Sequence, residues 1–113
     1  MKWIVGLLVL FAPYAAHAQL HNTDLSTTVG TSSASCIAAN TGRKTLYLEN
    51  PSGNPNTVGF CNGSGCTAVI GAAGTTVLPP GTTVFWPLYT APVEQLNCIA
   101  SGSSTPLTAR SQK

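Results

Sequence analysis

The chain has 113 residues, and only 7% of them are charged, which gives a formal net charge of +2. This balance offers no basic stripe for nucleic acid and no acidic cluster for calcium, so both classes of binding are excluded. Solubility then has to come from Ser, Thr, Asn and Gly, a composition common in exported β proteins and in surfaces that pack against copies of themselves.

The amino terminus has the pattern of a secretory signal peptide. Lys2 precedes an apolar run from residue 4 to residue 11, and Ala16-His17-Ala18 supplies small residues at both recognition positions of a cleavage site. We predict a signal peptide over residues 1–18, cleaved after Ala18. Because a membrane span needs about 20 apolar residues, we expect membrane contact only during export and a secreted or periplasmic protein.

The next segment, residues 19–33, is polar and β-branched with few apolar anchors, so we predict an extended N-terminal arm or an edge strand. Residues 34–110 are predicted to form the folded domain. Its first strand covers residues 34–39, and the turn Asn40-Thr41-Gly42 would pair this strand with the following one in an antiparallel unit.

Two strands with a shared core are predicted from residue 44 to residue 61. Leu46 and Leu48 alternate with polar positions in residues 44–50, which is typical of a half-buried strand. Residues 50–56 include two prolines and no apolar side chain, so they form a loop. Alternation returns at residues 57–61, where Val58 and Phe60 would cover the same core.

Short apolar segments continue to the end of the domain. Pro79-Pro80-Gly81 predicts a tight turn in which the glycine takes a positive φ. The strand after it would place Val84 and Trp86 on one face and Phe85 on the other. The remaining strands are predicted at residues 66–70, 75–78, 93–100 and 105–110, before the chain frays at 111–113. The pattern indicates an all-β fold, a small antiparallel β-sandwich or barrel of about seven strands.

Four cysteines in an exported chain predict disulfides, which would support the thin core of a small domain. Three pairings are open to them. Residues 62–65 form a four-residue turn between Cys61 and Cys66, which would bring these two sulfurs within bonding distance. This pairing is favoured, and it leaves Cys36 for Cys98. A zinc site would need four well-spaced ligands and is disfavoured.

The order of these features resembles a family of small β-sandwich structural proteins of tailed phages and prophages. The resemblance rests on SASCIAANTGRKTLYLENPSGNPNTVGF, VLPPGTTVFW and PVEQLNCIASGSSTPLTAR, within residues 33–110. It implies a virion-associated or cell-surface module without catalysis. Arg43, Asn50, Ser52 and Gly81 match the family's motif, and we expect structural roles for them. Arg43 would bond carbonyls of a neighbouring loop, and Asn50 would cap its own turn.

Catalytic candidates are few, and we predict no catalytic, cofactor-binding or metal-binding residues. His21 lies in a polar segment without a serine and carboxylate partnership. Glu49 and Glu94 could form a glycosidase pair, but the chain is too short to build a sugar cleft around them. Strand-end positions in solvent are the better interpretation for both carboxylates.

The aromatic side chains divide into core and surface. Trp86 and Phe60 are predicted to lie in the core. Tyr47, Phe85 and Tyr89 are predicted off the inner face, where they form a binding surface if they cluster and ordinary exposed aromatics if they are scattered.

The leading hypothesis is a non-enzymatic, exported structural or assembly module that acts through a protein partner or self-assembly. A secreted carbohydrate- or surface-binding module that uses the three surface aromatics is the alternative, and it would make a glycan the partner. A disulfide-stapled hydrolase inhibitor, with the loop at residues 61–66 or 51–56 as its reactive element, is a further alternative.

Overall fold

The structure is a computed structural model that describes residues 21–113, so the signal peptide predicted at residues 1–18 lies outside the described residues. The described part contains nine β-strands: β1 (Asn22–Asp24), β2 (Thr27–Val29), β3 (Ala34–Ile37), β4 (Thr45–Glu49), β5 (Val58–Asn62), β6 (Thr76–Leu78), β7 (Thr83–Trp86), β8 (Leu96–Ala100) and β9 (Thr105–Gln112). Residues 21–113 contain no helix with the length and apolarity of a membrane span.

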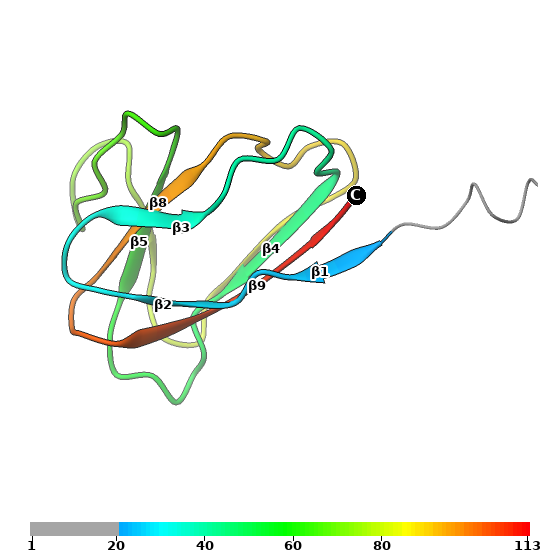
Figure 1. The fold of residues 1–113 in the computed structure, drawn as a ribbon. Helices are drawn as coiled ribbons and strands as arrows, with labels where there is room; N and C mark the ends of the chain where they lie inside the picture. Colours follow the sequence, from blue (N-terminus) through cyan, green and yellow to red (C-terminus); the bar gives the residue numbers. More distant parts are fainter. Residues whose placement is uncertain (1–20) are drawn as a thin grey trace, which may run out of the picture.

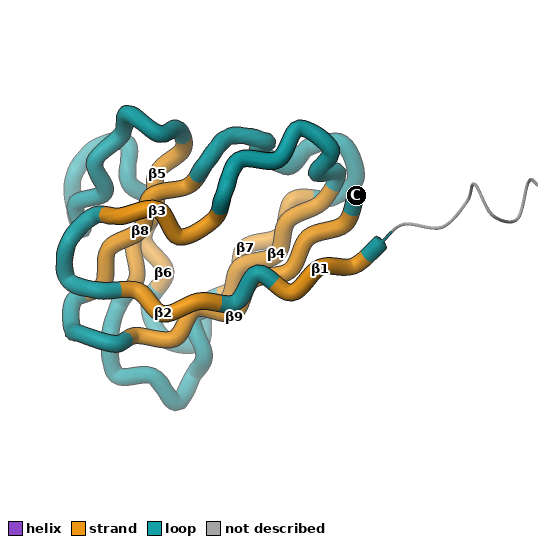
Figure 2. The backbone as a smooth tube through the Cα atoms, in the orientation of Figure 1, coloured by secondary structure: helices purple, strands orange, loops and turns teal. Residues whose placement is uncertain are grey.

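The strands form two antiparallel sheets that lie as layers over one another (Figures 1 and 2). One sheet has the order β1-β9-β4-β7, with β2 also paired to β9, and the other has the order β3-β8-β5-β6. The predicted all-β, disulfide-stapled sandwich is therefore confirmed. Two of the strands, β1 and β2, form within the segment predicted as an arm or edge strand. The boundaries of that segment and of the domain at 34–110 stay a prediction.

The core lies between the inner faces of the two sheets, and alternation of side chains along each strand builds it. Leu46 and Leu48 of β4 are fully buried, and Val58 and Phe60 of β5 face them from the other sheet, as the sequence predicted. The loop at residues 50–57 therefore carries the chain from one layer to the other.

The predicted antiparallel unit of residues 34–39 with residues 44–50 is wrong, because the two strands lie in different sheets. β3 pairs with β8, and β4 pairs with β9 and β7. Both strands have a buried apolar side, Ile37 in one and Leu46 in the other. Placing them in facing layers buries these sides against a common core, which a two-stranded hairpin could not do.

The strand predicted at residues 66–70 is also absent, because side chains bond the backbone of this segment in place of a neighbouring strand. The Ala68 N–H donates to Ser33 Oγ at 2.9 Å, and Asn97 Nδ2 donates to the Cys66 carbonyl at 2.7 Å. The segment instead folds over the outer face of β5. There Gly59 leaves the necessary room, since a Cβ would come within 3.3 Å of Ile70 Cγ1 and within 2.8 Å of the methyl group of Thr75, which follows the segment.

The chain does not fray at residues 111–113, contrary to the prediction. β9 continues to Gln112, Ser111 is buried, and the backbones of Lys113 and His21 exchange hydrogen bonds of 3.1 and 3.4 Å. The reason is β1, which pairs with the last residues of β9 and holds them in the sheet.

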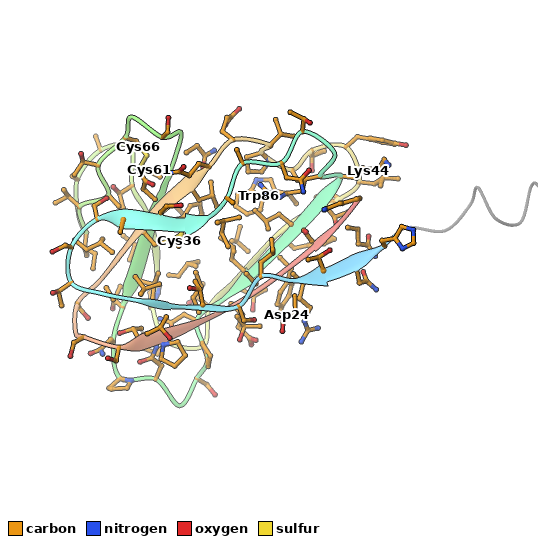
Figure 3. All side chains as sticks on the ribbon, viewed as in Figure 1. Asp24, Cys36, Lys44, Cys61, Cys66 and Trp86 are labelled. Atoms are coloured by element: carbon orange, nitrogen blue, oxygen red, sulfur yellow. A yellow bond between two sulfur atoms is a disulfide. The ribbon has the colours of Figure 1, made fainter. Side chains whose placement is uncertain are left out.

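Both favoured disulfides are confirmed, Cys36–Cys98 and Cys61–Cys66. Cys36 lies at a bulge, where the register of β3 against β8 shifts between Ser35 and Ile37. The bond therefore joins neighbouring strands of one sheet. Cys61 is the fourth residue of β5, and its partner lies in the turn that follows this strand (Figure 3).

The expected role of Arg43 is confirmed, because its guanidinium bonds carbonyls of a neighbouring loop. Nη1 donates to the Pro92 carbonyl at 2.8 Å, and Nη2 donates to the Ala38 carbonyl at 2.6 Å. The side chain is 5% exposed, and this burial lowers the pKa of Arg43. These bonds fix the connection between β3 and β4 against the connection between β7 and β8.

Asn50 holds its own loop together, as expected, and also ties that loop to the other sheet. Its side-chain nitrogen donates to the carbonyls of Asn56 and Leu78, both at 2.8 Å, and its oxygen accepts from Asn54 Nδ2 at 2.9 Å. The side chain is fully buried. A buried amide is tolerated when its hydrogen bonds are made, so the loop depends on this residue.

The two disulfides should contribute unequally to stability. In the chain-entropy model the cost of removing a disulfide rises with the length of the loop it closes, and the sequence separations here are 62 and 5 residues. We expect the double variant Cys36→Ala with Cys98→Ala to lose about 4 kcal/mol of unfolding free energy, and Cys61→Ala with Cys66→Ala about 2 kcal/mol. Urea denaturation measures both. Equal losses would contradict this account.

Candidate functional site

The outer face of the five-stranded sheet carries a row of side chains that crosses four strands. The pairing register places Asp24 opposite Arg110, Arg110 opposite Tyr47, and Tyr47 opposite Phe85. Residues directly opposite in a sheet lie on the same face with their Cβ atoms about 5 Å apart. The row therefore runs from a carboxylate through a guanidinium to two aromatic rings.

Charge and aromatic contacts order this row. The Arg110 guanidinium carbon lies 5.7 Å from the centre of the Tyr47 ring, a distance at which a cation is attracted to a ring face. Hydrogen bonding by Ser26 holds the pKa of Asp24 below its ordinary value, and Arg110 adds a smaller effect in the same direction. Figure 3 shows Asp24 directed away from the space between the layers, where Trp86 lies.

A hollow of about 210 Å³ opens beside the row. Its lining combines the two aromatic rings and the Arg110 guanidinium with polar side chains of β1, β4 and β9. The full set of lining residues is Asn22, Thr45, Tyr47, Phe85, Arg110, Ser111 and Gln112. The hollow thus offers apolar ring surface next to hydrogen-bond donors and acceptors, which is the usual makeup of a binding surface.

Large apolar side chains continue past the end of β7 into the following turn. Phe85 is 57% exposed, Leu88 is 45% exposed and Tyr89 is 76% exposed. Tyr89 also has a φ of 66°, in the left-handed region that a bulky residue rarely adopts. A strained backbone that holds an aromatic ring in solvent is a reason to consider function, since stability does not require it.

The structure brings two of the three predicted surface aromatics together. Tyr47 and Phe85 are neighbours in the row and line the same hollow, whereas Tyr89 is not among its lining residues. A binding role for the three stays a prediction. Arg110, which completes the row, was missed by sequence reasoning. Its sequence context gives no signal, because its neighbours belong to strands far away in the chain.

Trp86 lies on the core side of β7, which carries Phe85, and Phe60 lies on the core side of β5 in the other sheet. Their rings meet edge to face across the two layers, with centroids 5.8 Å apart. Phe60 is buried, and Trp86 is partly buried and packs against the core cluster. This contact supports β7, the strand that carries Phe85, from the core side of the sheet.

The histidine and the two glutamates that the sequence offered as catalytic candidates are not members of the row. His21 is exposed before β1, and Glu49 lies on β4. Glu94 lines a second hollow, of about 610 Å³, with residues 39, 41, 63, 64, 93 and 95. Residues 21–113 hold no group of three or more His, Cys, Asp or Glu side chains that could bind a metal ion.

These features define a small all-β protein with two sheets and two disulfides. No protein-family model matches the chain, and no curated protein matches it. A solved structure described as belonging to the disulfide-linked pili of Bacillus endospore appendages is similar at a TM-score of 0.48 and 16% identity, over 83% of this chain and 82% of that chain. We draw no function from a similarity of this size. The comparisons show no link to phage proteins, so that resemblance stays a prediction.

The left-handed backbone at Tyr89 should cost stability. We expect Tyr89→Gly to raise the unfolding free energy by about 0.5–1 kcal/mol, because glycine adopts this φ without strain. Tyr89→Ala should leave it nearly unchanged, since alanine keeps the strain. Leu88→Gly is the matched control at a position with negative φ, and it should lower stability. Thermal or urea unfolding of the three variants measures the differences; a loss in Tyr89→Gly as large as that in Leu88→Gly would show that the ring itself stabilises the fold.

Proposed function

We propose that this protein is an exported, non-enzymatic structural module that assembles through protein–protein contacts, chiefly with further copies of itself. Disulfides persist in oxidising compartments, so the two bonds support export. The resemblance of residues 33–110 to structural proteins of tailed phages and prophages supports a structural role, and we propose a common origin with such modules.

One observation carries this proposal: the exposed apolar side chains at one end of the five-stranded sheet, from Phe85 to Tyr89. Apolar side chains that gather on a surface, with polar side chains around them, mark interaction sites. Aromatic residues are also enriched at the centre of protein interfaces. The segment from residue 82 to residue 92 contains no charged residue, so no charge opposes the approach of an identical surface.

The test is the mass of the oxidised chain in solution, measured by light scattering over a concentration series. We expect association that grows with concentration in the wild-type chain. A variant with Phe85→Ser, Leu88→Ser and Tyr89→Ser should stay monomeric over the same range. The matched control is Val69→Ser with Ile70→Ser, which removes exposed apolar side chains at another place and should associate like the wild type. A wild-type chain that stays monomeric at about 1 mM would contradict the proposal.

Carbohydrate binding is the second candidate, and the hollow beside Tyr47 and Phe85 favours it. Aromatic rings can stack on the apolar face of a sugar, and the amides of Asn22 and Gln112 can bond its hydroxyl groups. Arg110 would supply further donors.

A glycan array probed with the oxidised chain tests this candidate. We expect Tyr47→Ala to weaken any glycan signal at least tenfold, because the ring forms one wall of the hollow. Tyr89→Ala should leave the signal unchanged, since Tyr89 does not line the hollow. An array without signal would exclude the candidate.

A further inference from the structure

Three of the four sheet edges in the described part carry features that prevent pairing with another chain. The edge formed by β1 and β2 is interrupted between the two strands and carries the charged Asp24. The edge at β3 contains a bulge between Ser35 and Ile37, and β6 is only three residues long. Interruptions, charges, bulges and short strands are the usual means by which proteins block edge pairing.

The fourth edge, β7, is uninterrupted, uncharged and free of a bulge. Its four residues, Thr83–Trp86, are uncharged and pair with β4 in regular register. The strand lies in the chain between Gly81, which has a φ of 82°, and Pro87. A regular, uncharged edge strand presents unpaired backbone groups that can template another strand.

The hydrogen bonds around β4 show which backbone groups of β7 are unpaired. The Asn50 N–H, in the register that continues the β4–β7 pairing, donates to the Thr82 carbonyl at 3.0 Å. On the other side of β4, the Leu25 N–H donates to the Ala109 carbonyl at 2.8 Å, so the odd-numbered residues of β9 face β1 and its even-numbered residues bond the odd-numbered residues of β4. Even-numbered residues of β4 therefore direct their backbone groups towards β7. Because this direction alternates along an antiparallel pair, the N–H and C=O groups of Thr83 and Phe85 point away from β4.

We propose that β7 pairs in antiparallel fashion with β7 of a second copy of this chain, which joins two five-stranded sheets across a twofold axis. The register places Val84 opposite the same residue of the second copy, and Thr83 opposite Phe85. Each of the two Thr83–Phe85 pairs then exchanges both of its backbone hydrogen bonds. This inference rests on the proposed function and names the surface through which it acts.

The register identifies a second copy as the partner, because an identical β7 strand can accept and donate all the hydrogen bonds that the outward backbone groups of β7 leave open. The two outward-facing residues lie on either side of Val84, so a twofold axis at Val84 pairs each with the other. Side chains directly opposite in the register share a face, so inner faces stay aligned and Phe85 meets Thr83 on the outer face. A closed twofold contact of this kind is the commonest form of self-association.

The contact is small, so the association is expected to be weak. Stable interfaces bury about 1,200–2,000 Å², and a strand of four residues with the nearby Leu88 and Tyr89 supplies only part of that. We expect a dissociation constant of about 100 µM, at which about a fifth of the chains are monomeric at about 1 mM.

Amide hydrogen exchange of the oxidised wild-type chain at about 20 µM and about 1 mM tests the register. We expect the amides of Thr83 and Phe85 to exchange about fourfold more slowly at the higher concentration, because pairing protects them. The amides of Val84 and Trp86 are internal controls, since they bond to β4 in the monomer and should not change. Equal slowing along the whole strand, or no slowing, would overturn the inference.

Two substitutions at one position separate backbone pairing from contact of the ring. Phe85→Ala removes the ring and keeps the N–H, and Phe85→Pro removes both. Proline is tolerated on an edge strand where the N–H faces outwards. We expect Phe85→Ala to keep the concentration-dependent mass and Phe85→Pro to be monomeric at about 1 mM.

The outcomes distinguish this inference from the proposed function. If both variants associate as the wild type does, or both lose association equally, pairing through β7 is wrong and assembly through another contact stands. A wild-type chain that remains monomeric at about 1 mM overturns both.

Discussion

The contact between the inner faces of the two sheets is the interaction on which the rest of the structure depends. Leu46, Leu48 and Leu107 on one face meet Val58 and Leu96 on the other, and all five are buried. The long loops that cross between the layers connect strands of one sheet to strands of the other and so place the two inner faces opposite each other. The outer row at Tyr47 and Phe85 exists because the neighbours of these residues along each strand are committed to the core.

A core of this size is supplemented by groups that tie layers and loops together. The Cys36–Cys98 bond closes the longer loop, and Asn50 links the end of β4 to the Leu78 carbonyl in the other sheet. Arg43 links the connection between β3 and β4 to the connection between β7 and β8. The buried Asn50 amide and the two terminal nitrogens of Arg43 make hydrogen bonds to these loops, so they specify one arrangement of loops where apolar contact alone would allow several.

The surface features follow from the same constraint. Three edges are interrupted, bulged or short, whereas β7 is regular and uncharged, and the largest exposed apolar side chains lie in it and just after it. Trp86 anchors this strand through its ring contact with Phe60. A rigidly held edge beside exposed rings is the combination from which we infer assembly.

The sequence by itself determined the fold class and most of the strands, because alternation and turn residues are local signals. It also favoured the disulfide pairing, because the loop from Cys61 to Cys66 is short. Only the tertiary structure decided which strands are neighbours: β3 beside β8, β1 along the end of β9, and residues 66–70 bonded by Ser33 and Asn97 without a strand. These choices depend on contacts between residues distant in the chain. For the same reason the row from Asp24 to Phe85 is invisible in the sequence, since register alone brings its four strands together.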